Sequence, residues 1–288
     1  MKIRSFAKVN LGLEILRRRD DGYHDIRTLF QTVGLADVLE FEATTDGAVR
    51  LEGDDASIPW DGTNLVFRAA RLLQERARTS PGVRIRVAKK VPPGKGLGGG
   101  SSNAALTLWA LNKLWAAGLD AGTLGDMALR LGSDVPYFLE GGLCLGEGRG
   151  NVLTPLADLP PLPCVLAFPP YPIMTAEIYA GVRSSLTSEG KDSRIMRFLE
   201  TRDFGLLEND LESVIFRRHP ELGGLKKFLR DQGASLSLVT GSGSAVFGLF
   251  SGRETARKAI ERLRGQSAAL LVDTLPREGY WAQVGAGV

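Results

Sequence analysis

A glycine-rich stretch is the strongest chemical signal in the chain. Residues 91–103 read Val-Pro-Pro-Gly-Lys-Gly-Leu-Gly-Gly-Gly-Ser-Ser-Asn, and five of the seven residues at 94–100 are glycine. Glycine lets backbone N–H groups approach an anion without interference from a Cβ atom. We expect a helix over 104–117, whose N-terminus would offer unpaired N–H groups and partial positive charge. The stretch predicts a phosphate-binding loop, with Ser101 and Ser102 as further donors or as an oxygen ligand for Mg²⁺; the alternative is a structural turn.

Two common nucleotide motifs do not describe this loop. Gly94-x-Gly96-x-x-Gly99 matches the dinucleotide fingerprint, but that motif also needs a second strand ending in an acid about 20 residues on. Asp120 lies at that distance, in a linker between two expected helices. Lys95 is followed by glycine rather than Ser or Thr, so the Walker A pattern is not met either. Both readings fail.

A second loop of small residues, Gly241-Ser242-Gly243-Ser244, joins two strand-like runs at 235–239 and 245–250. A plain hairpin turn explains this composition. Four small residues would equally let a phosphate group or a second loop approach closely. The residues alone leave both readings open.

Three segments carry a resemblance to a known family. Residues 92–105 are similar to the phosphate loop of the GHMP kinases (galacto-, homoserine, mevalonate and phosphomevalonate kinases). Residues 5–13, Ser-Phe-Ala-Lys-Val-Asn-Leu-Gly-Leu, and 240–247, Thr-Gly-Ser-Gly-Ser-Ala-Val-Phe, resemble the first and third motifs of that family. The resemblance covers most of the chain. It implies an ATP-dependent small-molecule kinase that needs Mg²⁺. It also implies an α+β fold of two lobes, an N-terminal ATP-binding lobe over 1–154 and a C-terminal lobe over 155–288, with a cleft between them.

The resemblance also implies a set of ATP-binding positions. On the residues alone, Asn64 could equally cap a helix, and Lys89 could be a surface charge at the end of a strand. Lys95 stands where relatives usually have a small residue; it could add a cation beside the triphosphate, but we favour a side chain that points to solvent. Beyond Ser101, we identify no protein ligand for Mg²⁺. The implied ATP-binding residues are Asn64, Lys89, Pro92, Gly94, Gly96, Leu97, Gly98, Gly99, Gly100, Ser101, Ser102, Asn103, Gly241, Ser242 and Gly243.

Two residues match the catalytic pair of the family. Asp134, in Gly-Ser-Asp-Val-Pro-Tyr, would accept the proton of the substrate hydroxyl, a contribution of about 10²–10⁴-fold. Lys8 would orient Asp134 and offset the charge that develops on the phosphoryl oxygens. Without the resemblance, Asp134 would be taken as a helix cap or a loop acid. Lys8 would be taken as a solvated strand residue.

Two segments, Asp-Gly-Tyr-His at 21–24 and Gly-Ser-Asp-Val-Pro-Tyr at 132–137, resemble one branch of the family. The members of this branch use ATP to phosphorylate the 2-hydroxyl of an alcohol that carries a cytidine diphosphate, in the non-mevalonate isoprenoid route. The resemblance implies that Tyr23 and Tyr179 sandwich the cytosine ring, where many relatives have Phe in place of Tyr179; such stacking is worth about 1–3 kcal/mol. His24 would hydrogen-bond the edge of the base, although a structural loop histidine is the alternative. Asn10, on the same strand face as Lys8, and Thr175 would line the same pocket.

Three other functions agree with the sequence less well. Another small-molecule kinase of this family is the first, but mevalonate and homoserine offer no base for Tyr23 and His24 to bind. A catalytically dead nucleotide-binding regulator is the second; the presence of both Lys8 and Asp134 argues against it. An RNA-binding role would need a clustered basic patch, and the basic residues are spread along the chain.

The elements that must position these residues alternate without a strict βαβ rhythm, which indicates an α+β fold. The proline-rich segment 155–172 is the best candidate for a boundary. The helices we expect run over 63–77, 104–117, 123–131, 203–217, 222–232 and 254–264. The strands we expect run over 2–16, 83–87, 235–239, 245–250 and 279–285.

The composition is that of an ordinary globular chain. Of 288 residues, 43% are hydrophobic and 24% charged, and the formal net charge is +3, which excludes a disordered or fibrous protein. Two cysteines and two histidines exclude a disulfide framework and a site with several histidine ligands. Residues 1–16 do not form a signal peptide, and the six prolines within 159–176 exclude a membrane helix. We expect a cytoplasmic enzyme that binds neither membrane nor nucleic acid; its oligomeric state is left open.

Overall fold

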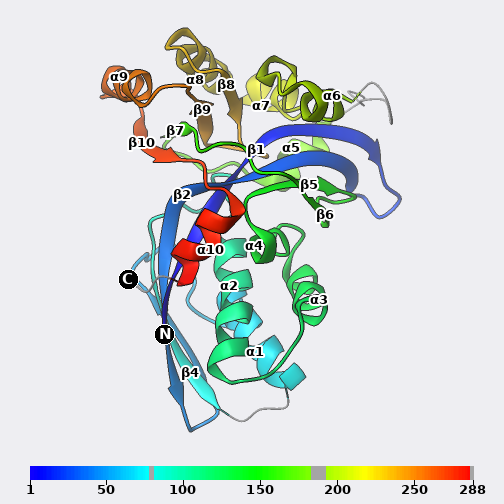
Figure 1. Cartoon of the computed structure of the whole chain (residues 1–288), viewed down its shortest axis with the longest axis vertical. Coiled ribbons are helices and arrows are strands. Elements are labelled where there is room, and N and C mark those ends of the chain that lie inside the picture. The colour runs from blue at the N-terminus through cyan, green and yellow to red at the C-terminus, as the bar shows by residue number, and fades with distance from the viewer. Residues whose placement is uncertain (78–80, 183–192, 286–288) are drawn as a thin grey trace.

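Two long antiparallel strands run through both lobes of the molecule (Figure 1). They are β1 (Lys2–Arg18) and β2 (His24–Thr44). The computed structural model describes residues 1–77, 81–182 and 193–285. Their pairing shifts at three points, between Phe6 and Ala7, between Asn10 and Gly12, and between Ile15 and Arg17 of β1. Such bulges bend and twist a ribbon. The ribbon can therefore belong to the first sheet at one end and support the second lobe at the other.

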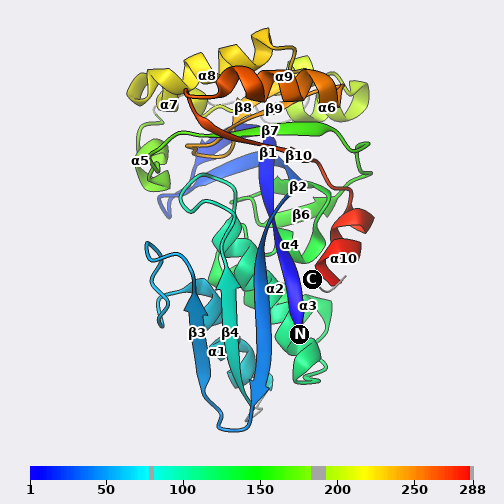
Figure 2. The same cartoon turned by 90° about the vertical axis from the view of Figure 1, so that its left-hand side faces the viewer.

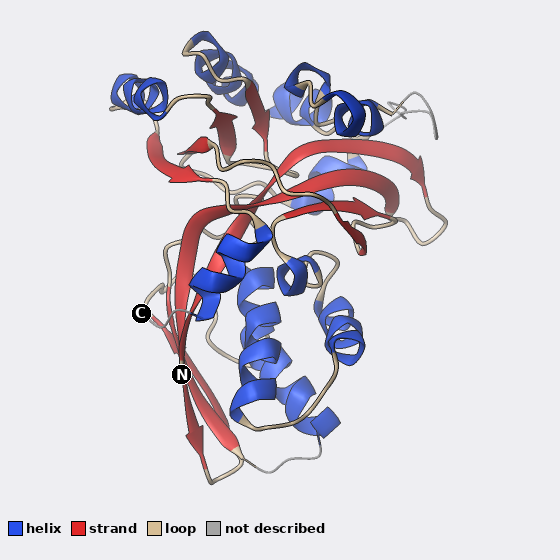
Figure 3. Cartoon of the chain, in the orientation of Figure 1, coloured by secondary structure: helices blue, strands red, loops and turns tan. Residues whose placement is uncertain are grey.

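The first lobe is a six-stranded sheet with helices on one face (Figure 3). Its strand order is β3-β4-β2-β5-β6, and β1 pairs with β2 off this path. The strands besides β1 and β2 are β3 (Val49–Gly53), β4 (Gly82–Ala88), β5 (Leu143–Glu147) and β6 (Val152–Pro155). The helices are α1 (Leu65–Ala77), α2 (Gly99–Leu114), α3 (Ala121–Leu131) and α4 (Tyr137–Glu140).

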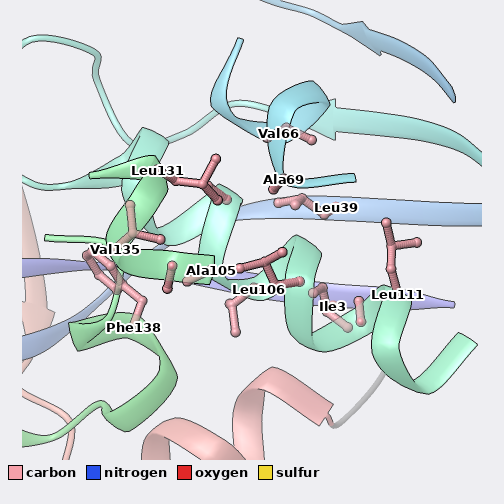
Figure 4. Packing of buried hydrophobic residues seen from close by; sticks show 14 of the residues in the cluster. Ile3, Leu39, Val66, Ala69, Ala105, Leu106, Leu111, Leu131, Val135 and Phe138 are labelled. Carbon is pink, nitrogen blue, oxygen red and sulfur yellow. The ribbon is translucent and has the colours of Figure 1, made fainter. Parts of the chain in front are cut away.

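The core of this lobe lies between the sheet and the helices. Figure 4 shows Ile3 of β1 and Leu39 of β2 facing Leu106 of α2. All three are at most 2% exposed, and full burial of one such side chain stabilises a fold by about 1.5–3 kcal/mol. This packing fixes α2, whose first turn follows the glycine-rich loop.

The second lobe is a four-stranded sheet in the order β10-β7-β9-β8, with helices on its outer side (Figure 2). Its inner face packs on β1, where Val9 and Leu11 share a core cluster with Leu166 and Leu238. The strands are β7 (Pro163–Phe168), β8 (Leu236–Val239), β9 (Val246–Leu249) and β10 (Ala268–Asp273). The helices are α5 (Thr175–Ala180), α6 (Arg194–Thr201), the 3₁₀ turn η1 (Phe204–Leu206), α7 (Glu212–Arg218), α8 (Pro220–Asp231) and α9 (Arg253–Leu263).

The α+β fold in two lobes is confirmed, and so is the antiparallel hairpin β8–β9. The proline-rich segment 155–172 contains strand β7. The helix expected over 203–217 is instead the short turn η1 followed by α7, and the helix expected from 104 begins five residues earlier, at Gly99. The division of the chain after residue 154 stays a prediction. In the part of the chain that the structure describes, no helix combines the length and the apolarity that a membrane span requires.

The strand predicted over 279–285 is wrong. These residues belong to a helix, α10 (Arg277–Gly285), and the nearby strand is β10. Tyr280 and Val284 are fully buried and one helical turn apart, which puts them on the same face. The Tyr280 hydroxyl donates to the Phe138 carbonyl at 2.6 Å, so α10 packs against α4 of the first lobe. The apolar alternation at 280, 282 and 284 fits a strand as well as a helix, and packing against α4 decides between them.

Candidate active site

The glycine-rich loop connects β4 to α2. Gly94, Gly96 and Gly98 all have positive φ, between 67° and 76°, a backbone conformation that side chains disfavour. Gly98 is the N-cap of α2 and has no side chain to cap it, so the first N–H groups of the helix are left for another acceptor. A Cβ at Gly96 would lie 2.2 Å from the Thr240 carbonyl oxygen. The loop is therefore seated directly on the loop between β8 and β9.

A cavity of about 430 Å³ lies over this loop. We call it the loop cavity. It contains most of the predicted ATP-binding positions, including Asn64 and Lys89. Its walls come from residues 57–60, 64–66, 89, 91–101 and 103.

Several predicted ATP-binding side chains already have protein partners. Asn64 caps α1, with its Oδ1 accepting from Val66 N at 3.0 Å, so the cap reading is correct while the residue also lines the cavity. Ser102 is fully buried and does not line the loop cavity; its hydroxyl hydrogen-bonds that of Ser5 at 2.7 Å. Of the two loop serines, Ser101 is the one that lines the cavity.

The base of the loop is held by Asp37 of β2. This carboxylate is fully buried, accepts from the backbone N–H groups of Lys90 and Val91 at 2.7 and 2.8 Å, and accepts from Asn103 Nδ2 at 2.9 Å. Its fourth partner is the ammonium group of Lys89. Lys89 is thus not a free surface charge. The sequence reasoning missed Asp37; an acid inside the apolar run 35–39 is the signal that could have found it.

The sequence analysis favoured a Lys95 side chain that points to solvent, and this prediction is wrong. The residue is 8% exposed. Its ammonium group donates to the carbonyl oxygen of Pro169 at 2.6 Å and to that of Tyr171. The expectation rested on the ease with which long lysine side chains reach water. The close approach of the second lobe covers this position instead.

A larger cavity, of about 790 Å³, lies in the cleft between the lobes. We call it the cleft cavity. It contains both predicted catalytic residues and all five predicted substrate-binding residues. Its walls come from Lys8, Asn10, Leu13, Arg18, residues 21–24, Ile26, Phe30, Gly96, Gly98, Ser133, Asp134, Arg149, Thr175, Ala176, Tyr179, Ala180, Val182, Gly241 and Ser242.

Lys8, Asn10 and Asp134 form one polar cluster. Lys8 is 3% exposed; its Nζ donates to Asn10 Oδ1 at 2.7 Å and lies 3.3 Å from Asp134 Oδ2. Asn10 Nδ2 donates to Thr28 Oγ1 at 2.9 Å, which fixes the amide orientation. The N-cap of the following helix α4 is Pro136, so Asp134 does not cap it. The side chain of Asp134 is 37% exposed, and its carboxylate faces the cavity beside a buried ammonium.

Aromatic side chains close the other end of the cleft cavity. His24 and Tyr179 have ring centroids 5.4 Å apart, while Tyr23 is 53% exposed. Burial, and then the charge of Arg18, lowers the pKa of His24, so its ring is neutral at pH 7. Its Nδ1 is buried and has no protein partner among the described residues. A neutral imidazole with an unused nitrogen can hydrogen-bond a ligand.

The loop between β8 and β9 faces the cleft cavity rather than the loop cavity. Gly241 and Ser242 line the cleft cavity, and the Ser242 hydroxyl hydrogen-bonds that of Thr175 at 2.8 Å. Gly243 lines neither cavity, and a Cβ there would lie 3.1 Å from Val239. None of Gly241, Ser242 and Gly243 lines the loop cavity that contains Asn64 and Lys89.

Comparisons with known proteins identify the family of the chain. Family models match two segments, the GHMP kinases N terminal domain over residues 64–142 and the GHMP kinases C terminal domain over 195–268. A 4-diphosphocytidyl-2-C-methyl-D-erythritol kinase from Syntrophus aciditrophicus (strain SB) is 42% identical over 260 residues, which cover 90% of this chain and 93% of the relative. One from Solibacter usitatus (strain Ellin6076) is 40% identical and covers 97% of this chain and 90% of the relative.

The chain belongs to the GHMP kinases, in the 4-diphosphocytidyl-2-C-methyl-D-erythritol kinase family. A crystal structure of a 4-(cytidine 5'-diphospho)-2C-methyl-D-erythritol kinase is similar to this kinase with a TM-score of 0.83 and 41% identity, covering 95% of this chain and 99% of that one. The mevalonate kinase of Methanococcus jannaschii has a TM-score of 0.75 at 16% identity, which shows the shared fold alone.

Sequence reasoning missed two charged residues that line the cleft cavity, Arg18 and Arg149. The guanidinium carbon of Arg149 lies 3.6 Å from the centroid of the Tyr23 ring, a cation–π contact. Arg149 sits in a Gly-Arg-Gly turn between β5 and β6, and nothing in its local sequence signals a binding role. Its Nε atom is buried and has no protein partner among the described residues.

Proposed function

We propose that this chain transfers the γ-phosphate of ATP to the 2-hydroxyl group of 4-diphosphocytidyl-2-C-methyl-D-erythritol. One observation carries the proposal. Gly96 and Gly98 line both cavities, and a Cβ at Gly98 would lie 3.3 Å from Lys8 Cε. The two cavities therefore meet at the Lys8–Asp134 pair, where a phosphate from one side and a hydroxyl from the other can come together.

ATP is proposed to occupy the loop cavity. The N–H groups at the start of α2 and the positive end of its dipole favour phosphate oxygens there. Ser101 would add its hydroxyl. Lys89, Ser102 and Asn103 would act mainly by holding the loop, because each is engaged with Asp37 or Ser5.

Mg²⁺ is proposed to enter with ATP. The described residues contain no group of three or more His, Cys, Asp or Glu that could hold a metal ion. A hydroxyl such as that of Ser101 fits a cation held chiefly by phosphate oxygens. When bound, the ion would neutralise charge on the phosphates.

The cytidine diphosphate arm is proposed to occupy the cleft cavity. The cytosine ring would stack between Tyr23 and Tyr179, and the unused nitrogen of His24 would bind the edge of the base. Arg149, stacked on Tyr23, would place a positive charge beside the diphosphate. Asn10 and Thr175 would line the path from the base to the reacting hydroxyl.

The phosphoryl transfer then depends on two side chains. Asp134 would hold the 2-hydroxyl and take its proton as the oxygen bonds to the γ-phosphorus, while the bond from that phosphorus to the β,γ-bridging oxygen breaks and ADP leaves. Lys8 would hold Asp134 in place, and would offset negative charge on the transferring phosphoryl group. Lys8 is almost completely buried, so its charge is weakly screened by water.

A cytoplasmic location and the division into lobes at 1–154 and 155–288 are proposed with this function. Cys144 and Cys164 are both buried and free, which suits a reducing compartment. The proposed boundary falls at the end of β6.

The decisive experiment measures ADP release from the purified protein with ATP and Mg²⁺. Three alcohols are compared: 4-diphosphocytidyl-2-C-methyl-D-erythritol, mevalonate and homoserine. We expect turnover with the first alone, and a loss of about 10²–10⁴-fold in kcat for Asp134→Asn. Asp126→Asn, an exposed residue of α3, is the matched control and should keep full activity. Turnover with mevalonate or homoserine would refute the substrate, and ATP binding without any turnover would favour a regulator.

A further inference from the structure

Lys95 is a buried charge that the proposed mechanism does not use. Its ammonium group lies between the lobes and donates to two carbonyl oxygens of the second lobe, those of Pro169 and Tyr171. Burial lowers the pKa of Lys95, as expected when an ammonium group loses water. Such a group is held in a protein interior only where hydrogen bonds offset the lost hydration. The two carbonyl oxygens provide those bonds, so the contact has a defined geometry.

The backbone around Lys95 is attached to the same region. The Lys95 carbonyl oxygen accepts from Ala245 N at 3.2 Å. The Ser244 hydroxyl donates to the Tyr171 carbonyl oxygen at 2.6 Å, so this oxygen has two donors, one from each loop. A Cβ at Gly94 would lie 2.9 Å from Pro172 Cβ. The phosphate loop, the β8–β9 loop and the segment 169–172 thus meet around one carbonyl oxygen.

Tyr171 is also fixed by its side chain. The phenol hydroxyl donates to Glu221 Oε1, and the ring is stacked on His219 with centroids 5.1 Å apart and planes 21° apart. Tyr171 is therefore anchored to α8 on one side and to Lys95 on the other. Helix α5 begins four residues later, and it carries Thr175 and Tyr179 into the cleft cavity.

We propose that Lys95 is a positioning residue whose hydrogen bonds hold the phosphate loop against the segment that leads into α5. The position of the phosphate loop then determines the position of α5, which forms one wall of the cytidine pocket. The inference rests on the proposed function of the cleft cavity. Lys95 would act on the nucleoside through Tyr171 and α5, without touching it. Removing these hydrogen bonds should weaken cytidine binding even when no ATP is present.

The test is calorimetric titration of the full chain with cytidine 5'-diphosphate in the absence of ATP. Lys95→Met keeps the length and apolar stem of the side chain and removes the three N–H donors. We expect its Kd for cytidine 5'-diphosphate to rise about tenfold, the scale of one lost charge-assisted hydrogen bond. Lys90→Met is the matched control, because the Lys90 side chain is exposed. Its Kd should equal that of the wild type.

A second variant keeps the test informative if Lys95→Met does not fold. Ser244→Ala removes the other donor to the Tyr171 carbonyl oxygen and leaves the charge of Lys95 in place. We expect a rise of roughly threefold in the same Kd, since this bond is neutral and the carbonyl keeps one donor.

The possible results separate the two proposals. A wild-type protein that does not bind cytidine 5'-diphosphate refutes the proposed function. A wild-type protein that binds it, together with folded variants of unchanged Kd, refutes the role of Lys95 and leaves the proposed function intact. A variant with unchanged affinity for cytidine 5'-diphosphate but weakened affinity for an ATP analogue would assign Lys95 to ATP instead. A lower melting temperature with an unchanged Kd would reduce Lys95 to a structural contact.

Discussion

Replacing Asp37 with Asn should destabilise the protein and weaken ATP binding together. The change keeps the shape of the side chain but exchanges one carboxylate oxygen for an NH₂ group. Asp37 is fully buried, and one of its oxygens accepts from both Lys89 Nζ and Asn103 Nδ2. An amide oxygen can still accept from Lys90 N and Val91 N. The new NH₂ group would then face two donors, one of them a charged ammonium.

The magnitude follows from the lost ion pair. The Lys89 side chain is 8% exposed, so its charge would remain buried without a counter-ion. Removing one partner of a buried pair costs about 3–5 kcal/mol. At about 2–4 °C per kcal/mol for a chain somewhat smaller than this one, the melting temperature should fall by roughly 6–20 °C. Because the same carboxylate holds the backbone of the phosphate loop, we expect KM for ATP to rise more than KM for the alcohol.

Thermal unfolding and steady-state kinetics check this prediction. Asp54→Asn is the matched control: Asp54 is exposed and accepts from Lys89 N at 2.8 Å, and an amide oxygen can replace that acceptor. Its stability should stay within about 0.5 kcal/mol of the wild type. Adding Lys89→Met to Asp37→Asn should restore part of the stability, because the unpaired charge is removed. The reasoning is refuted if the melting temperature of Asp37→Asn stays within about 2 °C of the wild type, since the fall per kcal/mol given above predicts a larger change.

Two further predictions concern the cleft cavity. Tyr23→Ala should weaken cytidine 5'-diphosphate binding roughly 5- to 150-fold, because about 1–3 kcal/mol of stacking is lost, whereas Tyr23→Phe should bind normally. Titration calorimetry distinguishes the two variants. Equal affinities for both would show that Tyr23 does not contribute to the pocket. The pKa of His24 lies below its usual 6.5 in the folded protein because of burial, so the unfolded chain binds the proton more readily. His24 therefore contributes full stability above about pH 6.5 and loses it as the pH falls through the folded pKa. Urea unfolding between pH 5 and 7.5 should show this loss in the wild type and a smaller one in His24→Gln, and identical pH dependence in both would contradict it.

The sequence could predict the parts of the site that depend on local backbone chemistry. Glycines with positive φ at 94, 96 and 98 are needed by the loop itself, so composition was enough to find it. The two-residue spacing of Lys8 and Asn10 put them on one strand face, and the two side chains are hydrogen-bonded. By contrast, the meeting of Lys8 with Asp134, 126 residues away, followed only from family resemblance.

Errors arose where a distant segment decides the environment. Lys95 was expected in solvent because no local feature reveals that residues 169–171 cover it. Residues 279–285 were expected to form a strand because alternation and helical spacing coincide over so short a run, and contact with α4 decides between them. Arg149 gave no signal, since its partner Tyr23 lies on another turn.

The position of α10 has a consequence for the synthesis of the chain. Tyr280 and Val284 belong to the same buried cluster as Ile3 and Phe6, and the rings of Phe6 and Tyr280 are 5.8 Å apart. A ribosome adds about 5–20 residues per second, and the first lobe reaches its full core only after α10 has emerged. The first lobe therefore waits for one of the last segments to be made, although most of its sequence is made first. Strand β10, which belongs to the second sheet, ends only four residues before α10 begins, so neither lobe is complete until residues 268–285 have emerged.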